Sequence, residues 1–81
     1  MKPIEVTPEI IENYKNKNLI SYAEMAEKMG YEKYNFYNNL HHLRQGVGVI
    51  KFRKKIAEFF NDRNITLEEL KWNAEEHLQQ N

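Results

Sequence analysis

The sequence contains no cysteine, and only three glycines and two prolines among its 81 residues. Without thiols the chain has neither disulfides nor thiolate metal ligands, which fits the reducing interior of a cell. No apolar run approaches the roughly 20 residues that span a bilayer, and the N-terminal residues lack the apolar core of a signal peptide. These absences predict a cytoplasmic protein that has no membrane-spanning segment.

Residues that would carry out catalysis are also missing. There is no cysteine nucleophile, no glycine-rich phosphate loop, and no histidine–carboxylate arrangement at a useful spacing. A domain this short, built from small helices, has little room for the pocket of a few hundred Å³ that a small-molecule substrate occupies. We therefore expect no enzymatic activity, no catalytic residues, no small-molecule substrate and no cofactor.

Two adjacent histidines, His41 and His42, are the obvious candidates for metal ligands. Neighbouring positions on a helix point about 100° apart, whereas a zinc-binding pair stands four residues apart on one face. No Asp or Glu lies between residues 33 and 55 to complete a site. We therefore expect no metal site, and we expect His41 to lie on the outward face of its helix.

Acidic residues are absent from the whole middle third of the chain. Residues 33–55 carry six basic side chains and no acid, whereas residues 1–32 carry four lysines against six acids and residues 56–81 carry two basic residues against six acids. The three segments have formal charges of +6, −2 and −4, which cancel to the net charge of zero. A neutral chain with this distribution can present one positive face, which suits a polyanionic partner.

Apolar residues recur at three- and four-residue spacing, which predicts helices rather than strands. Thr7, followed by a proline, is a good helix start, and the S-x-x-E and T-x-x-E patterns at Ser21 and Thr66 are capping boxes. Gly30 is expected to end the second helix in a left-handed conformation. We predict a single all-α domain over residues 1–81, in which five short helices form a compact bundle.

The second and third of these helices are joined by a very short turn. Ala26, Gly30 and Phe36 follow one another at spacings of four and six residues. The small alanine permits close crossing of the helices, the glycine permits the turn, and the phenylalanine anchors the third helix. This combination predicts a helix-turn-helix over about residues 21–45. The full set of expected core residues is Ile10, Ile11, Tyr14, Met25, Ala26, Met29, Phe36, Leu40, Leu43, Val49, Phe52, Ile56, Phe59, Phe60, Leu67, Leu70, Ala74 and Leu78.

The stretch "ISYAEMAEKMGYEKYNFYNNL" resembles the helix-turn-helix of Cro and lambda-repressor-like proteins, the XRE-type regulators of phages and bacteria. The stretch "IKFRKKIAEFFNDRNITLEELKW" is similar to the fourth and fifth helices of that family, so the resemblance covers roughly residues 8–72. It implies the five-helix lambda-repressor-like fold in the cytoplasm of a bacterial or phage-infected cell. It also implies a homodimer that binds operator sites on double-stranded DNA, with the helix around residues 33–45 in the major groove.

The resemblance also assigns functional residues. The family places DNA-facing side chains at the third, fourth, seventh and eighth positions after the turn glycine, and helix geometry turns position 41 outward as well. The residues expected to face the bases are therefore Lys33, Tyr34, Tyr37, Asn38 and His41. Tyr22 stands where the family has a phosphate contact, and further phosphate contacts are expected from Arg44, Lys51 and Lys54 in and after the following loop.

The third helix departs from the family pattern in several ways, among them a greater length and Asn39 at a position that is usually apolar. Glu32 stands where the family prefers Ser or Thr as the N-cap, and its carboxylate suits the helix dipole but lies near the expected DNA phosphates. The outward face is aromatic rather than rich in Gln and Arg, and aromatic faces are typical of protein interfaces. The alternative is therefore a protein-binding module, such as an antirepressor or inhibitor, that uses this helix as its interface. The acidic C-terminal segment around Trp72 is expected to supply the self-contact of a dimer.

Overall fold

In the computed structural model the described residues, 5–71, form five α-helices and no strands, and the expected all-α, five-helix architecture is confirmed. The helices are α1 (Pro8–Lys17), α2 (Tyr22–Met29), α3 (Lys33–Arg44), α4 (Ile50–Asp62) and α5 (Leu67–Leu70). None of the helices in this part of the chain has both the length and the apolar composition needed to cross a bilayer.

Local side-chain chemistry fixes where three helices begin. Thr7, Ser21 and Thr66 are extended, and the hydroxyl oxygen of each accepts a hydrogen bond of 3.1–3.3 Å from the backbone N–H three residues later. Each bond satisfies one of the donors that a helix start leaves without an intrahelical partner. The predicted starts of α1, α2 and α5 are therefore confirmed.

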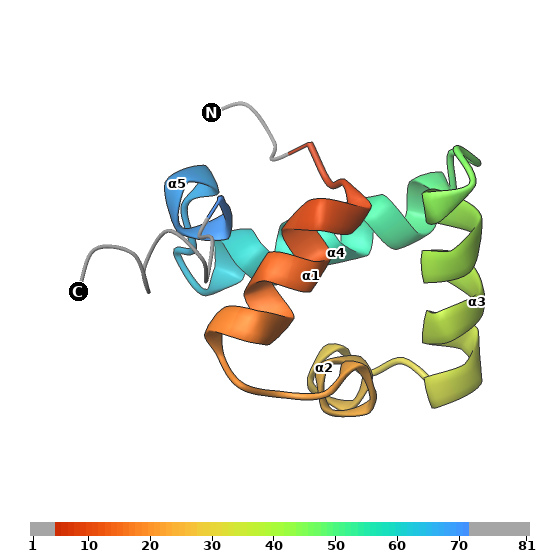
Figure 1. Ribbon diagram of the computed structural model, residues 1–81, viewed down its shortest axis with the longest axis horizontal. Coiled ribbons are helices and arrows are strands. Elements are labelled where there is room, and N and C mark those ends of the chain that lie inside the picture. The colour runs from red at the N-terminus through yellow and green to blue at the C-terminus, as the bar shows by residue number, and fades with distance from the viewer. Residues whose placement is uncertain (1–4, 72–81) are drawn as a thin grey trace.

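The core lies where α4 runs through the middle of the molecule, with α3 and α5 at opposite ends (Figure 1). One aromatic group joins α1 to α4, where the Tyr14 ring lies 5.6 Å from Phe59 and 5.2 Å from Phe60. A second group joins α3 to α4, where the Phe36 and Phe52 rings lie 5.4 Å apart. Fully buried side chains of this kind account for most of the stability of a small domain. The largest of them are Phe36, Phe52, Phe60, Ile11, Met25, Leu40, Ile56 and Leu70.

Three details of the expected core are corrected or refined by the structure. Val49 lies outside α4, because its φ of +38° makes it the left-handed residue before the helix and not the first helical residue. Leu67 is 41% exposed, because the short α5 turns only Leu70 toward the core. Leu43 is half-buried rather than buried. The expected core residues Ala74 and Leu78, and Trp72 with the proposed dimer segment, lie outside the described residues.

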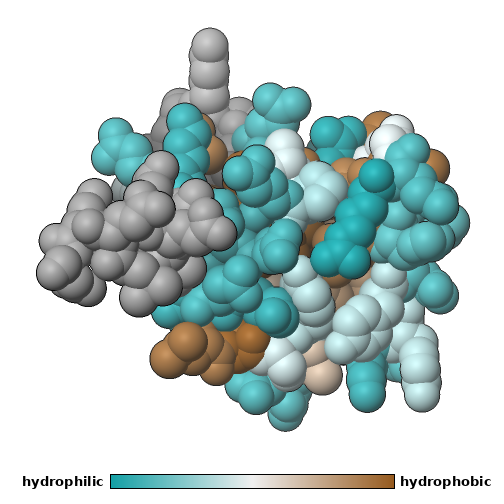
Figure 2. All heavy atoms as spheres, in the orientation of Figure 1, coloured by the Kyte–Doolittle hydropathy of each residue, from teal (hydrophilic) through white to brown (hydrophobic). Residues whose placement is uncertain are grey.

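Most of the surface is hydrophilic in the view of Figure 2. An apolar patch on this face lies over the connection between α1 and α2, where Leu19 is 92% exposed with a φ of +54°. A single exposed leucine is common on protein surfaces. Two exposed side chains with large aromatic rings, Tyr34 and Tyr37, both lie on α3.

Candidate functional site

The turn between α2 and α3 has the geometry that its sequence predicts. Gly30 has φ +76°, in the left-handed region that favours glycine. The N–H of Tyr31 then donates to the carbonyl of Ala26 at 2.8 Å, which closes the end of α2. Ala26 is 1% exposed and Phe36 is fully buried. The left-handed Gly30 is therefore confirmed, as is the burial of Ala26 and Phe36.

The start of α3 is capped by a carboxylate. The two oxygens of Glu32 accept hydrogen bonds from the N–H groups of Tyr34 and Asn35, at 3.2 and 3.1 Å. A carboxylate at this position also interacts favourably with the helix dipole. The helix then runs for twelve residues with Phe36 and Leu40 buried against the rest of the bundle, so its opposite side is left to face solvent.

The structure brings the five residues expected to face the bases together on that outer side of α3. They are Lys33, Tyr34, Tyr37, Asn38 and His41, and all five are exposed. Their spacing of three and four residues places them on one face of a helix. Tyr34 is 70% exposed and Tyr37 is 37% exposed. This set is called the outer face of α3 below.

Tyr22, the first residue of α2, joins three helices beside this outer face. Its hydroxyl oxygen accepts a hydrogen bond of 3.1 Å from the Arg44 guanidinium, and the Tyr37 ring lies 6.2 Å away. The Lys15 ammonium of α1 lies 4.9 Å from the centroid of the Tyr22 ring, on which Arg44 also stacks at 5.7 Å. The two expected phosphate contacts Tyr22 and Arg44 therefore lie together, and Lys15 joins them.

Partial burial raises the pKa of the Tyr22 hydroxyl above its ordinary value, and the positive charge of Arg44 opposes that shift. The phenol therefore stays protonated near neutral pH. Its oxygen accepts from Arg44 while its hydrogen remains available to an acceptor such as a phosphate oxygen. Lys15 was missing from the predicted site because it stands seven residues before Tyr22 on a different helix. A basic residue on the last turns of α1 is the only signal that the sequence offers for it.

The other two predicted phosphate contacts, Lys51 and Lys54, are exposed on the first turns of α4. This helix begins near the C-terminal end of α3 (Figure 1), so the two lysines place two more positive charges near that end. The neighbouring basic residues make contacts within the protein. Arg53 donates to the carbonyl of Gly48 at 2.6 Å, and the Lys55 ammonium lies 4.4 Å from the centroid of the Tyr31 ring.

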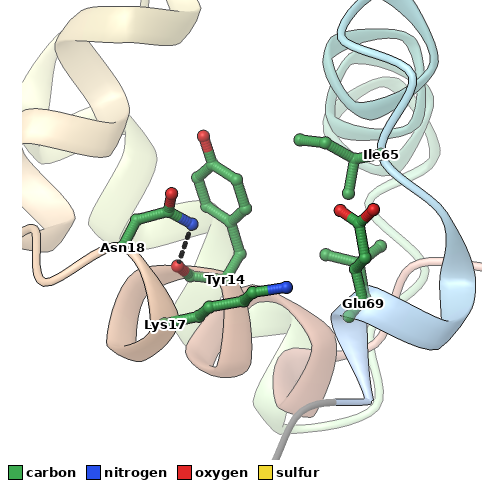
Figure 3. A pocket seen from close by; sticks show the side chains of 6 residues that line it. Tyr14, Lys17, Asn18, Ile65 and Glu69 are labelled. Atoms are coloured by element: carbon green, nitrogen blue, oxygen red, sulfur yellow. Dashed lines mark hydrogen bonds between the residues drawn. The ribbon is translucent and has the colours of Figure 1, made fainter.

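A small hollow lies on the far side of the molecule, between α1 and α5. Its volume is about 100 Å³, well below the several hundred Å³ that drug-sized ligands occupy. Lys17 and Glu69 reach toward it from opposite walls (Figure 3). Among residues 5–71, no three histidine, aspartate or glutamate side chains gather as metal ligands. The His41 and His42 rings are 6.0 Å apart.

A scan against protein-family models, a search of curated proteins and a search of solved structures find no match to this chain. The likeness to Cro and lambda-repressor-like proteins therefore stays a prediction that rests on the motifs quoted above.

Proposed function

We propose that this protein is a transcriptional regulator of the Cro or repressor type that binds double-stranded DNA through α3. The outer face of α3 is the single observation that carries the proposal, because five polar and aromatic side chains stand exposed together on one helix. An α-helix about 10–12 Å wide fits the major groove of B-DNA. The segment from Lys33 to Lys55 carries no acid, so its charge is complementary to the phosphate backbone on either side of the groove.

The side chains of the outer face differ in what they can recognise. The carboxamide of Asn38 has a donor and an acceptor that match the major-groove edge of adenine. Lys33 can donate to guanine or to a phosphate. Tyr34 and Tyr37 offer rings to thymine methyl groups and hydroxyls to phosphates. In this proposal Asn38 supplies the main sequence preference.

The cluster around Tyr22 supplies backbone contacts that fix the position of α3. Tyr22, Arg44 and Lys15 present one hydroxyl and two cations from three different helices within a few ångströms. Lys51 and Lys54 add two charges beyond the C-terminal end of α3. Phosphate contacts of this kind orient a protein on the duplex without reading its sequence. A cytoplasmic homodimer would place two such helices on the two halves of an operator.

A second candidate function rests on the exposed tyrosines. Tyr34 is 70% exposed, and tyrosines on a protruding helix are common anchors of protein–protein interfaces. The protein would then act as an antirepressor or inhibitor that covers another protein with α3. In that case Tyr37→Ala should weaken binding of the partner by about 2 kcal/mol or more.

The test of the DNA proposal is fluorescence anisotropy on a random-sequence duplex over a salt series. Each phosphate contact contributes about 0.9 to the slope of log affinity against log salt. The double variant Lys51→Gln, Lys54→Gln should therefore bind all duplexes more weakly, with a slope flatter by up to about two units. The matched control is Lys17→Gln, Lys71→Gln, which removes the same charge near α5.

In the control the slope should stay close to that of the parent, because Lys17 lines the hollow beside α5 and Lys71 directly follows that helix. Equal changes in both double variants would mean that only net charge matters and that the start of α4 does not touch DNA. Failure of the parent to bind any duplex at about 50 mM salt would reject the DNA proposal and leave the protein-binding candidate.

A further inference from the structure

The start of α3 differs from the other side-chain-capped helix starts in the described residues. α1, α2 and α5 are capped by hydroxyl groups, whereas α3 is capped by the exposed carboxylate of Glu32. Its oxygens lie 3.2 and 3.1 Å from the backbone nitrogens of Tyr34 and Asn35. The negative charge is therefore held in one place, at the end of the helix that carries the outer face.

This carboxylate occupies the position that a phosphate group would take at a helix start. Free N–H groups and the positive end of the helix dipole attract anions to such a start. In this chain two of those N–H groups already donate to Glu32. The next acid along the chain is Glu58, so Glu32 also stands at the edge of the longest acid-free segment. A duplex docked on α3 would meet one fixed negative charge among the basic ones.

We propose that Glu32 limits the affinity of the protein for the DNA backbone, so that it weakens binding to every duplex. This inference rests on the proposed DNA-binding function. The repulsion between a carboxylate and phosphates is independent of sequence, so it weakens binding to every duplex by a similar factor. The ratio of specific to non-specific affinity is unchanged, and the fraction of protein that is free of DNA rises. Glu32 acts in this way as a residue that sets how tightly the protein holds any duplex, without touching a base.

The experiment compares the parent protein with Glu32→Thr and Glu68→Gln. Threonine keeps a good N-cap while it removes the charge, and circular dichroism melting checks that α3 stays folded. Glu68, in the first turn of α5, is the matched loss of one carboxylate at the opposite end of the molecule. Anisotropy is measured on a random-sequence duplex and on a duplex selected from a random pool by the parent. Glu32→Gln serves as a second variant should the threonine melt early.

Glu32→Thr should bind both duplexes about three- to tenfold more tightly than the parent at about 50 mM salt, and the gain should shrink at higher salt. Glu68→Gln should show a clearly smaller gain. Weaker binding by Glu32→Thr on the selected duplex alone would mean that Glu32 accepts a hydrogen bond from a base, and would overturn the proposal. Equal affinities for Glu32→Thr, Glu68→Gln and the parent would also overturn it while the DNA-binding function stands. Absence of binding by the parent and both variants would reject the function itself.

Discussion

The two faces of α3 each carry aromatic side chains, but the surroundings of these side chains differ. On the inner face Phe36 and Leu40 are 0% and 1% exposed, and the Phe36 ring packs against Phe52 of α4. On the outer face Tyr34 is 70% exposed and Tyr37 is 37% exposed. The inner side chains therefore have their partners within the bundle. On the outer face Tyr37 keeps a neighbour, the Tyr22 ring at 6.2 Å, whereas Tyr34 has most of its surface in water.

This difference in burial separates the side chains of α3 that stabilise the fold from those that are free to contact a partner. Buried apolar side chains contribute about 1.5–3 kcal/mol each through removal from water, and the inner face receives that contribution. Tyr34, which is 70% exposed, receives little of it, so folding alone gives no reason for a tyrosine at that position. A surface that binds another molecule does give a reason, whether that molecule is DNA or a protein.

The largest expected effect contrasts the two faces directly. Phe36→Ala should lower the free energy of unfolding by about 3–5 kcal/mol, because it leaves a cavity between α3 and α4. Tyr34→Ala, on the same helix, should change it by no more than about 0.5 kcal/mol. Urea denaturation followed by circular dichroism measures both. Similar losses in the two variants would mean that the outer face also belongs to the core.

A somewhat smaller effect is expected at the turn that sets the direction of α3. Gly30→Val should cost about 2–3 kcal/mol, because a β-branched residue is strained at φ +76°. Apart from the adjoining residues of the chain, no heavy atom lies within 4 Å of an added Cβ at this position, so the loss comes from backbone strain rather than from a clash. Thermal melting measures the loss.

The control for this turn is Gly48→Ala, where an added Cβ would make only ordinary contacts at 3.9 Å. That change should be near neutral, or stabilising by up to about 1 kcal/mol through the unfolded state. A parent-like melting temperature for Gly30→Val would show that the turn tolerates another conformation, and the placement of α3 would then not depend on the glycine.

A third prediction concerns recognition by the outer face. Asn38→Ala should weaken binding to the preferred duplex by about 1–3 kcal/mol and leave binding to random duplexes unchanged, because it removes a base contact without changing charge. Asn35→Ala is a useful companion, since Asn35 lies on the same helix but its side chain accepts from Asn39 at 3.1 Å. Titration of each variant with the preferred duplex and with a random duplex, followed by fluorescence anisotropy, measures both affinities. A uniform loss on both would place Asn38 against the backbone instead of a base.

The smallest effect lies at Tyr22, where the two faces meet, since its ring lies 6.2 Å from both Phe36 and Tyr37. Burial raises the folded-state pKa of this phenol above 10.0, and burial also raises that of Tyr31. The resulting stability is fully present below the unfolded value and is lost as pH rises through the folded pKa.

Tyr22→Phe should therefore lose less stability than the parent between about pH 8 and about pH 11. The comparison of the two proteins cancels the titration of lysines, which both share. Urea denaturation at the two pH values provides the measurement. An identical alkaline loss in parent and variant would contradict the environment that the structure gives to Tyr22.

Features that depend on local chemistry were predictable from the sequence. The hydroxyl caps at Thr7, Ser21 and Thr66 need only a side-chain oxygen and a backbone N–H three residues away. The left-handed Gly30 needs only a residue without a Cβ. The buried side of α3 followed from the spacing of Phe36 and Leu40, and the same spacing identified the residues of the opposite face.

Features that depend on how distant segments meet were not predictable in this way. Lys15 of α1 lies 4.9 Å from the Tyr22 ring of α2 in the folded chain, and no motif marks that approach. Val49 was assigned to α4 because its apolar side chain fits the helical spacing, yet the preceding loop leaves it at φ +38°. Leu67 fits the apolar pattern of α5 equally well, but so short a helix buries only Leu70.

The most direct test of the central claim is a map of backbone amide chemical shifts by NMR as a DNA duplex is added to the labelled protein at about 50 mM salt. If the outer face of α3 binds DNA, the largest changes should fall on Lys33, Tyr34, Tyr37, Asn38 and His41. Smaller changes are expected at Tyr22 and at the start of α4, and amides of α5 should stay unchanged. Changes centred on α1 and α5, or no change on α3 when the duplex is in excess, would contradict the claim.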